Sequence, residues 1–200
     1  TGNTESTALN MNLNFAYNTE NWRHRFLATA LMTSEDGTQD NERYTAEFQS
    51  DRHLNEKSWI FGVFRWDADK FGSYDPQMSL TAGYGRLLMK SERHEMKGEI
   101  GAGYKKLEER ISGLETSEAI VRILLEDSWQ VFKTTKWDNR LLIETGSSNT
   151  FTQFDTGLAV SMTEKFAVKL GWQMRNNTKI PPEDEHNTDT VTSINLVYNF

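Results

Sequence analysis

Acidic and basic side chains alternate along several segments of this chain, and their pairing is its first candidate chemistry. Lys97 is followed two residues later by Glu99, and Arg140 is followed four residues later by Glu144, so both signs of charge fall on one side of an extended segment. Mixed signs predict either ion pairs that fill an interior or a narrow conducting path whose selectivity the charges set. The candidate interior-facing residues are Glu47, Asp51, Lys97, Glu99, Lys105, Arg122, Glu126, Arg140, Glu144, Asp155, Lys169 and Arg175.

Hydrolytic chemistry would need a general base, and the chain has four histidines. His24, His53 and His94 fall near strand ends or in short turns, and His186 lies in a polar loop. No serine, histidine and acidic residue recur at the spacing of a recognisable catalytic set. The absence of cysteine excludes thiol catalysis, disulfides and thiolate metal sites. We therefore predict no catalytic residue, with an enzyme acting on lipid or peptide as the alternative.

Acidic residues gather in three segments that we expect to be external loops. Oxygen-rich clusters can hold Ca²⁺ or Mg²⁺, including at lipopolysaccharide phosphates, but their spacing here fits no metal-binding loop. We predict solvated loops, with no metal and no cofactor. The segments carry Glu35, Asp36, Asp40 and Glu42, then Asp67, Asp69 and Asp75, then Glu183, Asp184, Glu185, His186 and Asp189.

The sequence argues against two further classes of ligand, nucleotides and nucleic acids. Gly98, Gly101 and Gly103 superficially match a nucleotide fingerprint, but the order is reversed and no strand-to-helix context surrounds them. Small residues that let neighbouring strands pack are the preferred interpretation. The chain carries 22 Lys and Arg against 29 Asp and Glu, a net charge of −7, which argues against a nucleic-acid partner.

Strands must position these groups, because apolar and polar residues alternate with a period of two. Leu9, Met11 and Leu13 oppose Asn10 and Asn12, and the same alternation returns along the chain. The faces of segment 22–33 are ambiguous, and segment 57–67 is apolar on both faces. The predicted strands are residues 6–18, 22–33, 42–52, 57–67, 77–90, 94–106, 117–131, 136–146, 152–162, 165–177 and 190–200.

Strand length and loop pattern favour a membrane barrel over a soluble β-barrel carrier, the second alternative. Many strands span ten or more residues, near the ~9–11 that cross a bilayer at a tilt. Short turns alternate with longer polar loops, as in outer-membrane barrels, where the turns are periplasmic. The longest apolar run, residues 59–64, is far below the ~18 residues of a membrane helix.

Aromatic residues predict two interfacial girdles at the ends of the strands. One girdle would hold Tyr17, Trp22, Trp59, Trp129, Trp137, Phe166, Tyr198 and Phe200 at the periplasmic end. The other would hold Tyr44, Trp66, Phe71, Tyr74, Tyr104 and Trp172.

The chain resembles a known family over essentially its whole length. The opening residues 1–6, the Gly83-Tyr84-Gly85 strand, the Pro181-Pro182 acidic loop and the Tyr198-Asn199-Phe200 ending are similar to the YdiY-like family of salt-induced outer-membrane proteins of unknown function. Ile194, Leu196, Tyr198 and Phe200 also resemble the C-terminal assembly signal of such barrels. This resemblance implies outer-membrane lipid, lipopolysaccharide and the barrel assembly machinery as partners, and it supplies no catalytic residue.

The prediction is one all-β domain over residues 1–200, a transmembrane antiparallel up-and-down β-barrel. Eleven strands is an odd number, and bacterial barrels usually have an even one. In the resembling family a further strand precedes this segment, so we expect a signal peptide and one first strand to be missing and the whole barrel to have twelve strands. The predicted function is a non-enzymatic outer-membrane protein, structural or forming a narrow passive pore, linked to salt or envelope stress.

Overall fold

The structure is a computed structural model that describes residues 6–35, 38–163, 165–180 and 186–198. None of these residues forms a helix that could span a membrane. The elements are eleven strands: β1 (Ser6–Asn18), β2 (Trp22–Glu35), β3 (Thr38–Asn55), β4 (Ser58–Asp69), β5 (Tyr74–Lys90), β6 (His94–Glu109), β7 (Glu115–Phe132), β8 (Thr135–Thr145), β9 (Thr150–Ser161), β10 (Phe166–Asn177) and β11 (Thr188–Tyr198).

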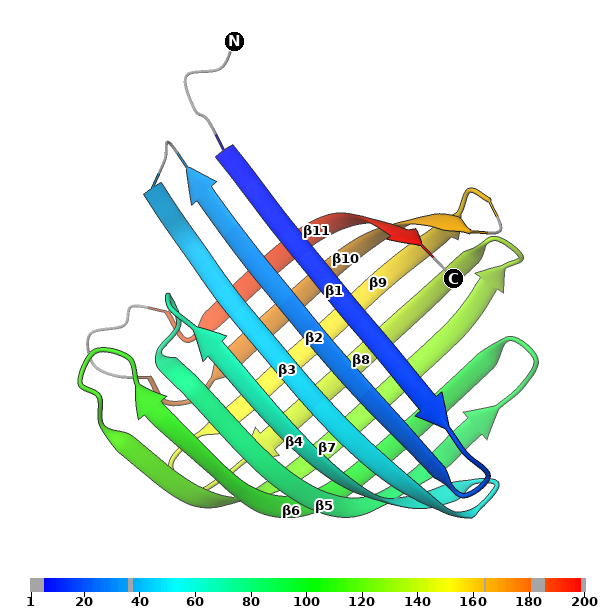
Figure 1. The fold of residues 1–200 in the computed structure, drawn as a ribbon, viewed down its shortest axis with the longest axis horizontal. Coiled ribbons are helices and arrows are strands. Elements are labelled where there is room, and N and C mark those ends of the chain that lie inside the picture. Colours follow the sequence, from blue (N-terminus) through cyan, green and yellow to red (C-terminus); the bar gives the residue numbers. More distant parts are fainter. Residues whose placement is uncertain (1–5, 36–37, 164, 181–185, 199–200) are drawn as a thin grey trace.

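Each strand pairs antiparallel with the next one in the chain, in the order β1 to β11. Figure 1 shows this single sheet curling around an interior, with β1–β3 facing β7–β11. Among the described residues, β1 pairs with β2 and β11 pairs with β10, so each of the two has one open edge. The predicted antiparallel up-and-down barrel fold and its eleven strands are confirmed.

The strands are 11 to 18 residues long, and several extend beyond their predicted bounds. We call the end with the β1–β2, β3–β4, β5–β6, β7–β8 and β9–β10 connections the turn end, and the opposite end the loop end. The loop-end connections are present but shorter than predicted, because the strands continue into them. Only residues 36–37 separate β2 from β3, and residues 110–114 separate β6 from β7. The connection from β10 to β11, residues 178–187, is the longest.

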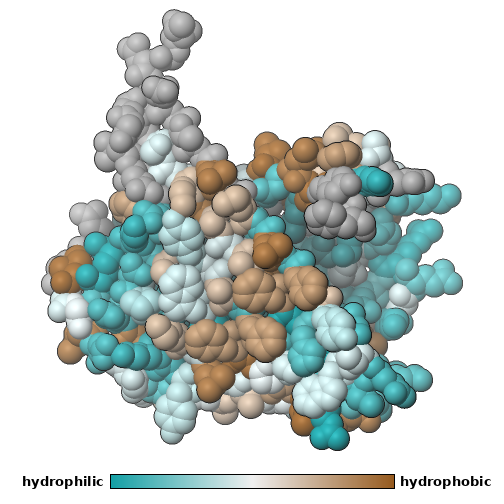
Figure 2. All heavy atoms as spheres, in the orientation of Figure 1, coloured by the Kyte–Doolittle hydropathy of each residue, from teal (hydrophilic) through white to brown (hydrophobic). Residues whose placement is uncertain are grey.

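Alternation gives the sheet two different faces. The outer face carries large apolar side chains such as Leu13, Ile100 and Leu170, all of them exposed. Figure 2 shows hydrophobic side chains gathered on the face that β1–β3 present to the viewer. The inner face carries charged and amide side chains, most of them buried.

The structure also resolves the strands whose faces were ambiguous. In β2 the inner face carries Arg25, which pairs with Glu126 across the interior, so Phe26 faces outward. In β4 the inner face is apolar at the turn end and charged at the loop end, which explains why this strand looked apolar on both sides.

Two residues assigned to the aromatic girdles lie elsewhere. Trp59 is buried on the inner face, where an added Cβ at Gly85 would lie 2.2 Å from its indole ring, so the glycine makes room for the ring. Tyr74 is also buried, and its hydroxyl donates a hydrogen bond of 3.1 Å to the backbone oxygen of Lys179. Alternation could not reveal that large rings fill the interior at these points.

Candidate functional site

The candidate site is the interior of the barrel, where side chains of strands that are not neighbours in the sheet meet. Arg140 of β8 lies 3.1 Å from Glu47 of β3, and Arg25 of β2 lies 3.2 Å from Glu126 of β7. Strands this far apart in the sheet can touch only through the interior, so both side chains of each pair must point inward. By these contacts and the period of two, the structure places all the predicted interior-facing residues on the inner face, including Lys97, Asp155 and Lys169.

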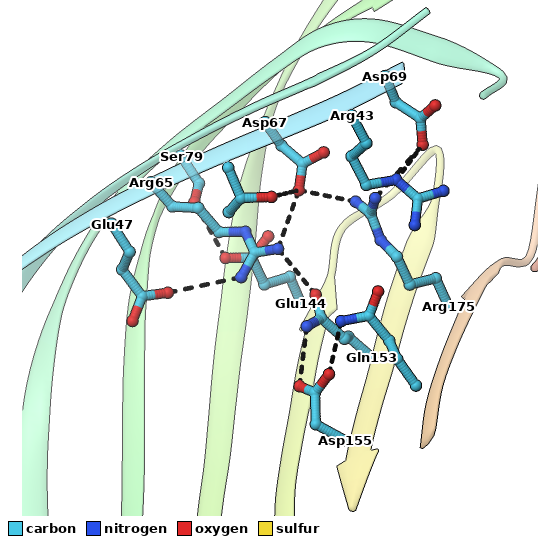
Figure 3. Close-up of polar contacts among 12 residues, drawn as sticks. Arg43, Glu47, Arg65, Asp67, Asp69, Ser79, Glu144, Gln153, Asp155 and Arg175 are labelled. Atoms are coloured by element: carbon cyan, nitrogen blue, oxygen red, sulfur yellow. Dashed lines mark hydrogen bonds and ion pairs between the residues drawn. The ribbon is translucent and has the colours of Figure 1, made fainter. Parts of the chain in front are cut away.

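Near the loop end, five charged residues form a cluster that we call the charged bridge: Arg43, Asp67, Asp69, Arg175 and Asp189. Arg175 of β10 lies 2.7 Å from Asp67 and 3.4 Å from Asp69, both on β4 (Figure 3). Arg43 pairs with Asp69 at 2.5 Å and reaches Asp189 of β11 at 3.6 Å. Asp67 is 3% and Arg175 5% exposed, so the bridge leaves little room for water beside it.

A second layer of polar contacts lies next to the bridge. Arg65 donates hydrogen bonds to Asp67 at 2.9 Å and to Gln153 of β9 at 2.8 Å, and it pairs with Glu47 at 3.5 Å (Figure 3). Glu144 accepts a hydrogen bond of 2.9 Å from Ser79. These contacts link β3, β4, β5, β8 and β9, so this layer holds opposite walls of the barrel together.

Phe151 is an apolar centre within this layer. Three cations lie over its ring, with Lys105 at 4.7 Å, Arg175 at 5.1 Å and Arg65 at 5.6 Å from the centroid. Cations over an aromatic face are attracted by its quadrupole, and the attraction grows as water is removed. Phe151 therefore supports three side chains whose charges are neutralised by the neighbouring carboxylates.

Nearer the turn end, Glu99 of β6 is the common acceptor. It receives hydrogen bonds from Gln49 at 2.8 Å, from the indole of Trp59 at 3.0 Å and from Arg122 at 3.1 Å. Arg122 is 1% exposed, and its guanidinium lies 5.5 Å from the ring of Phe61. This part of the interior is as thoroughly buried as a soluble core, although charges occupy it.

The inner faces of β9, β10 and β11 toward the turn end differ from the rest. We call this surface the small-residue wall; it carries Gly157, Ala159, Gly171, Ser193 and Asn195. Lys169 lies against it, because an added Cβ at Gly157 would be 2.3 Å from the lysine Cε. Within the described part of the chain, Lys169 makes no ion pair or side-chain hydrogen bond, and it is only partly buried.

Several interior residues were missed or misplaced in the sequence. Asp67 and Asp69 were expected in a solvated loop, but they lie on β4 and belong to the charged bridge, so that expectation is wrong. Their spacing of two from Arg65 was the signal that could have placed them inside. Arg43 was also missed, although it lies within the predicted strand 42–52 and at an even spacing from Glu47, which places both side chains on one face.

Another acidic residue of the predicted loops differs from a solvated group. Glu42 is buried and lies 2.5 Å from Lys70 in the β4–β5 connection. This hydrogen bond raises the pKa of the Lys70 amine. Asp36, Glu183, Asp184 and Glu185 lie outside the described residues, as do the side chains of Glu35 and Asp40.

The predicted assembly signal is described in part. Ile194 is 77% and Leu196 66% exposed, and both belong to the outer face of β11. The side chain of Tyr198 and the whole of Phe200 lie outside the described residues.

Two of the histidines, His24 and His94, lie on the outer face. His94 lies 2.5 Å from Asp127, whose other oxygen accepts a hydrogen bond from Asn139. Within the described ranges, no serine, threonine or tyrosine hydroxyl forms a hydrogen bond with the His94 ring. His24 stacks on Trp22, with ring centroids 6.0 Å apart. Among the described residues, no three His, Asp or Glu side chains are grouped to hold a metal ion.

Comparison with known proteins gives both a family and a fold. A family described as "Protein of unknown function, DUF481" matches residues 1–200. Uncharacterized protein YdiY of Escherichia coli (strain K12) is 25% identical over 199 residues, which cover 98% of this chain and 77% of that protein.

Among solved structures, the NanC porin superposes with a TM-score of 0.59 at 9% identity, covering 98% of this chain and 97% of that one. The CymD monoaromatic hydrocarbon channel gives a TM-score of 0.49 at 9% identity, covering 98% of this chain and 74% of that one. At such low identity the likeness to the NanC porin shows the fold alone.

Proposed function

The chain belongs to the DUF481 family of proteins of unknown function, and from that premise we propose that it is a non-enzymatic bacterial outer-membrane barrel with a narrow passive pore. The observation that carries the proposal is the inversion of the two faces. Charged and amide groups fill the inside, while large apolar side chains cover the outside. This arrangement suits lipid around the barrel and opposes a soluble carrier, whose apolar face would point inward.

The charged bridge would limit the pore. It joins β3 and β4 to β10 and β11 near the loop end, and its Arg43, Asp67, Asp69 and Arg175 are all buried. Solute would have to displace this bridge, so we expect small or infrequent conductance steps. Toward the turn end, the smaller side chains of the small-residue wall would leave a wider approach.

Lys169 would set the charge preference of that approach. Paired charges of opposite sign largely cancel within a few ångströms, whereas an unpaired charge dominates the local potential. Since Lys169 has no acidic partner among the described residues, we propose that the pore prefers anions.

Single-channel recording of the refolded protein in planar bilayers tests both statements. We expect the double variant Asp67→Ala, Arg175→Ala to raise the conductance several-fold, because it opens the charged bridge without changing net charge. We expect Lys169→Gln to lower the anion preference measured from the reversal potential. Lys133→Gln removes the same charge from the exposed β7–β8 turn and serves as the matched control.

Two outcomes would contradict the proposal at different points. If folded wild-type protein and the Asp67→Ala, Arg175→Ala variant were both silent, the barrel would be structural and no pore. If conductance steps appeared but Lys169→Gln and Lys133→Gln had equal anion selectivity, the protein would form a pore, but Lys169 would not set its selectivity.

Partners and physiology are proposed on the resemblance and the fold together. The outward Ile194 and Leu196 suit recognition of β11 by the barrel assembly machinery, and the loop end would meet lipopolysaccharide. A link to salt or envelope stress is also proposed. A deletion strain that grows as well as its parent in high salt would contradict that link.

A further inference from the structure

A groove of about 390 Å³ lies on the outer face of the barrel. Its floor consists of Ser50, Gly62 and Ala82, which are direct neighbours across β3, β4 and β5 in the sheet register. A Cβ added at Gly62 would meet nothing within 4 Å, so the groove is empty above the glycine. The groove falls within the size range of sites for small ligands, ~300–1,000 Å³.

Large apolar side chains form a ridge on each side of this floor. On one side, Ile60 and Tyr84 are neighbours in register, and on the other, Phe64 and Leu80 are neighbours. Ile60 is 45% and Phe64 43% exposed, so the ridges rise above the floor. An elongated apolar group would therefore be held along both of its sides.

The groove carries a cation and an aromatic ring at the turn end. Arg52 of β3 and Trp22 of β2 are register neighbours, and both line the groove. Arg52 is exposed, and it makes no ion pair or side-chain hydrogen bond with the part of the chain that the structure describes. The inner arginines at positions 23, 25, 43, 65, 122, 140 and 175 are all paired with carboxylates, whereas Arg52 faces outward.

We propose that this groove binds one glycerophospholipid of the periplasmic leaflet, with an acyl chain over Gly62 and the phosphate on Arg52. The inference rests on the outer-membrane placement in the proposed function, because in a bilayer this face meets lipid. Arginine pairs with phosphate through two parallel N–H donors, and a tryptophan ring is favoured at the headgroup level. The apolar floor with a single cation at its turn end thus complements a lipid that has an apolar chain and an anionic head.

Native mass spectrometry of the refolded, delipidated protein in detergent tests the site. The probe is dioleoyl phosphatidylglycerol, and dioleoylglycerol, which lacks the phosphate, separates chain binding from headgroup binding. We expect one tightly retained phosphatidylglycerol per barrel. Gly62→Leu fills the groove and should lower retention at least tenfold, and Arg52→Gln should lower it to the level of dioleoylglycerol. Arg52→Lys should restore part of the loss.

Ala119→Leu is the matched control, since Ala119 lies on the outer face of β7, away from the groove. It should bind phosphatidylglycerol as the wild type does. Equal retention by wild type, Gly62→Leu and Ala119→Leu would overturn the groove, and equal retention of the two lipids would overturn the role of Arg52. Planar-bilayer conductance of the same samples separates these results from a failure of the proposed pore, because the groove lies outside the conducting path.

Discussion

Two parts of the inner face are built on the same alternation but have opposite character. On β3–β8, many inner side chains are large, charged and buried, and they are joined to partners on other strands, as Arg140 of β8 is to Glu47 of β3. On β9–β11 toward the turn end, the small-residue wall carries glycine, alanine, serine and asparagine, and Lys169 beside it has no ion-pair partner among the described residues. The first part fills the barrel with paired charges, and the second carries smaller side chains.

This difference shows that a charge on the inner face has two possible roles. A buried ion offsets its desolvation only when partners satisfy it, so the charges of β3–β8 are tied to the structure. A partly exposed ion without a partner costs the fold little and remains available to a passing solute. Stability and conductance should therefore respond to different residues.

The largest expected effect comes from breaking a buried pair. Arg122→Ala would leave Glu99 buried with fewer donors, and we expect it to lower the free energy of unfolding by about 3–5 kcal/mol. Lys169→Ala should change the free energy of unfolding by no more than about 0.5 kcal/mol, because among the described residues Lys169 has no ion-pair partner that would be left buried without a counter-charge. Urea unfolding in lipid vesicles, followed by tryptophan fluorescence, measures both. Equal losses would abolish the distinction between the two parts of the inner face.

A smaller effect on the free energy of unfolding is expected when a charge is added to the outer face instead of the inner one. Ile123 faces outward on β7, and Ile123→Arg should cost about 2–4 kcal/mol if that position lies deep in a bilayer. Asn12→Arg places the same charge on the inner side of β1 and should be milder. The same unfolding assay applies, and equal tolerance of the two variants would count against a lipid-facing surface.

The smallest effect concerns glycines within the two parts of the inner face. Gly85→Ala would put a Cβ 2.2 Å from the indole of Trp59 and disturb its hydrogen bond to Glu99, so we expect a loss of about 1–3 kcal/mol. At Gly171 the added Cβ would lie 2.9 Å from the Ser193 hydroxyl, which can rotate away. Gly171→Ala should therefore cost less than about 1 kcal/mol. If Gly171→Ala cost more than Gly85→Ala, the small-residue wall would be packed more tightly than the inner face around Trp59.

Much of this architecture could be predicted because alternation is a local property. Residues such as Leu13 and Asn12 differ in polarity at adjacent positions, which is enough to assign strand and face. The inner positions of Glu47, Arg122 and Arg175 followed from the same rule. The rule failed for β4, where Trp59 and Arg65 share a face, because the interior itself changes from apolar to charged along the strand.

The sequence by itself determined the strands, their antiparallel order and the polarity of the two faces, since a period of two needs only neighbours in the chain. Only the tertiary structure decided that Arg175 meets Asp67, that Trp59 lies inside and that Lys169 lies against Gly157. These contacts join strands that are distant in the chain. Their formation depends on how tightly the sheet curls, which sets the distance between opposite strands, and no local pattern of residues encodes that distance.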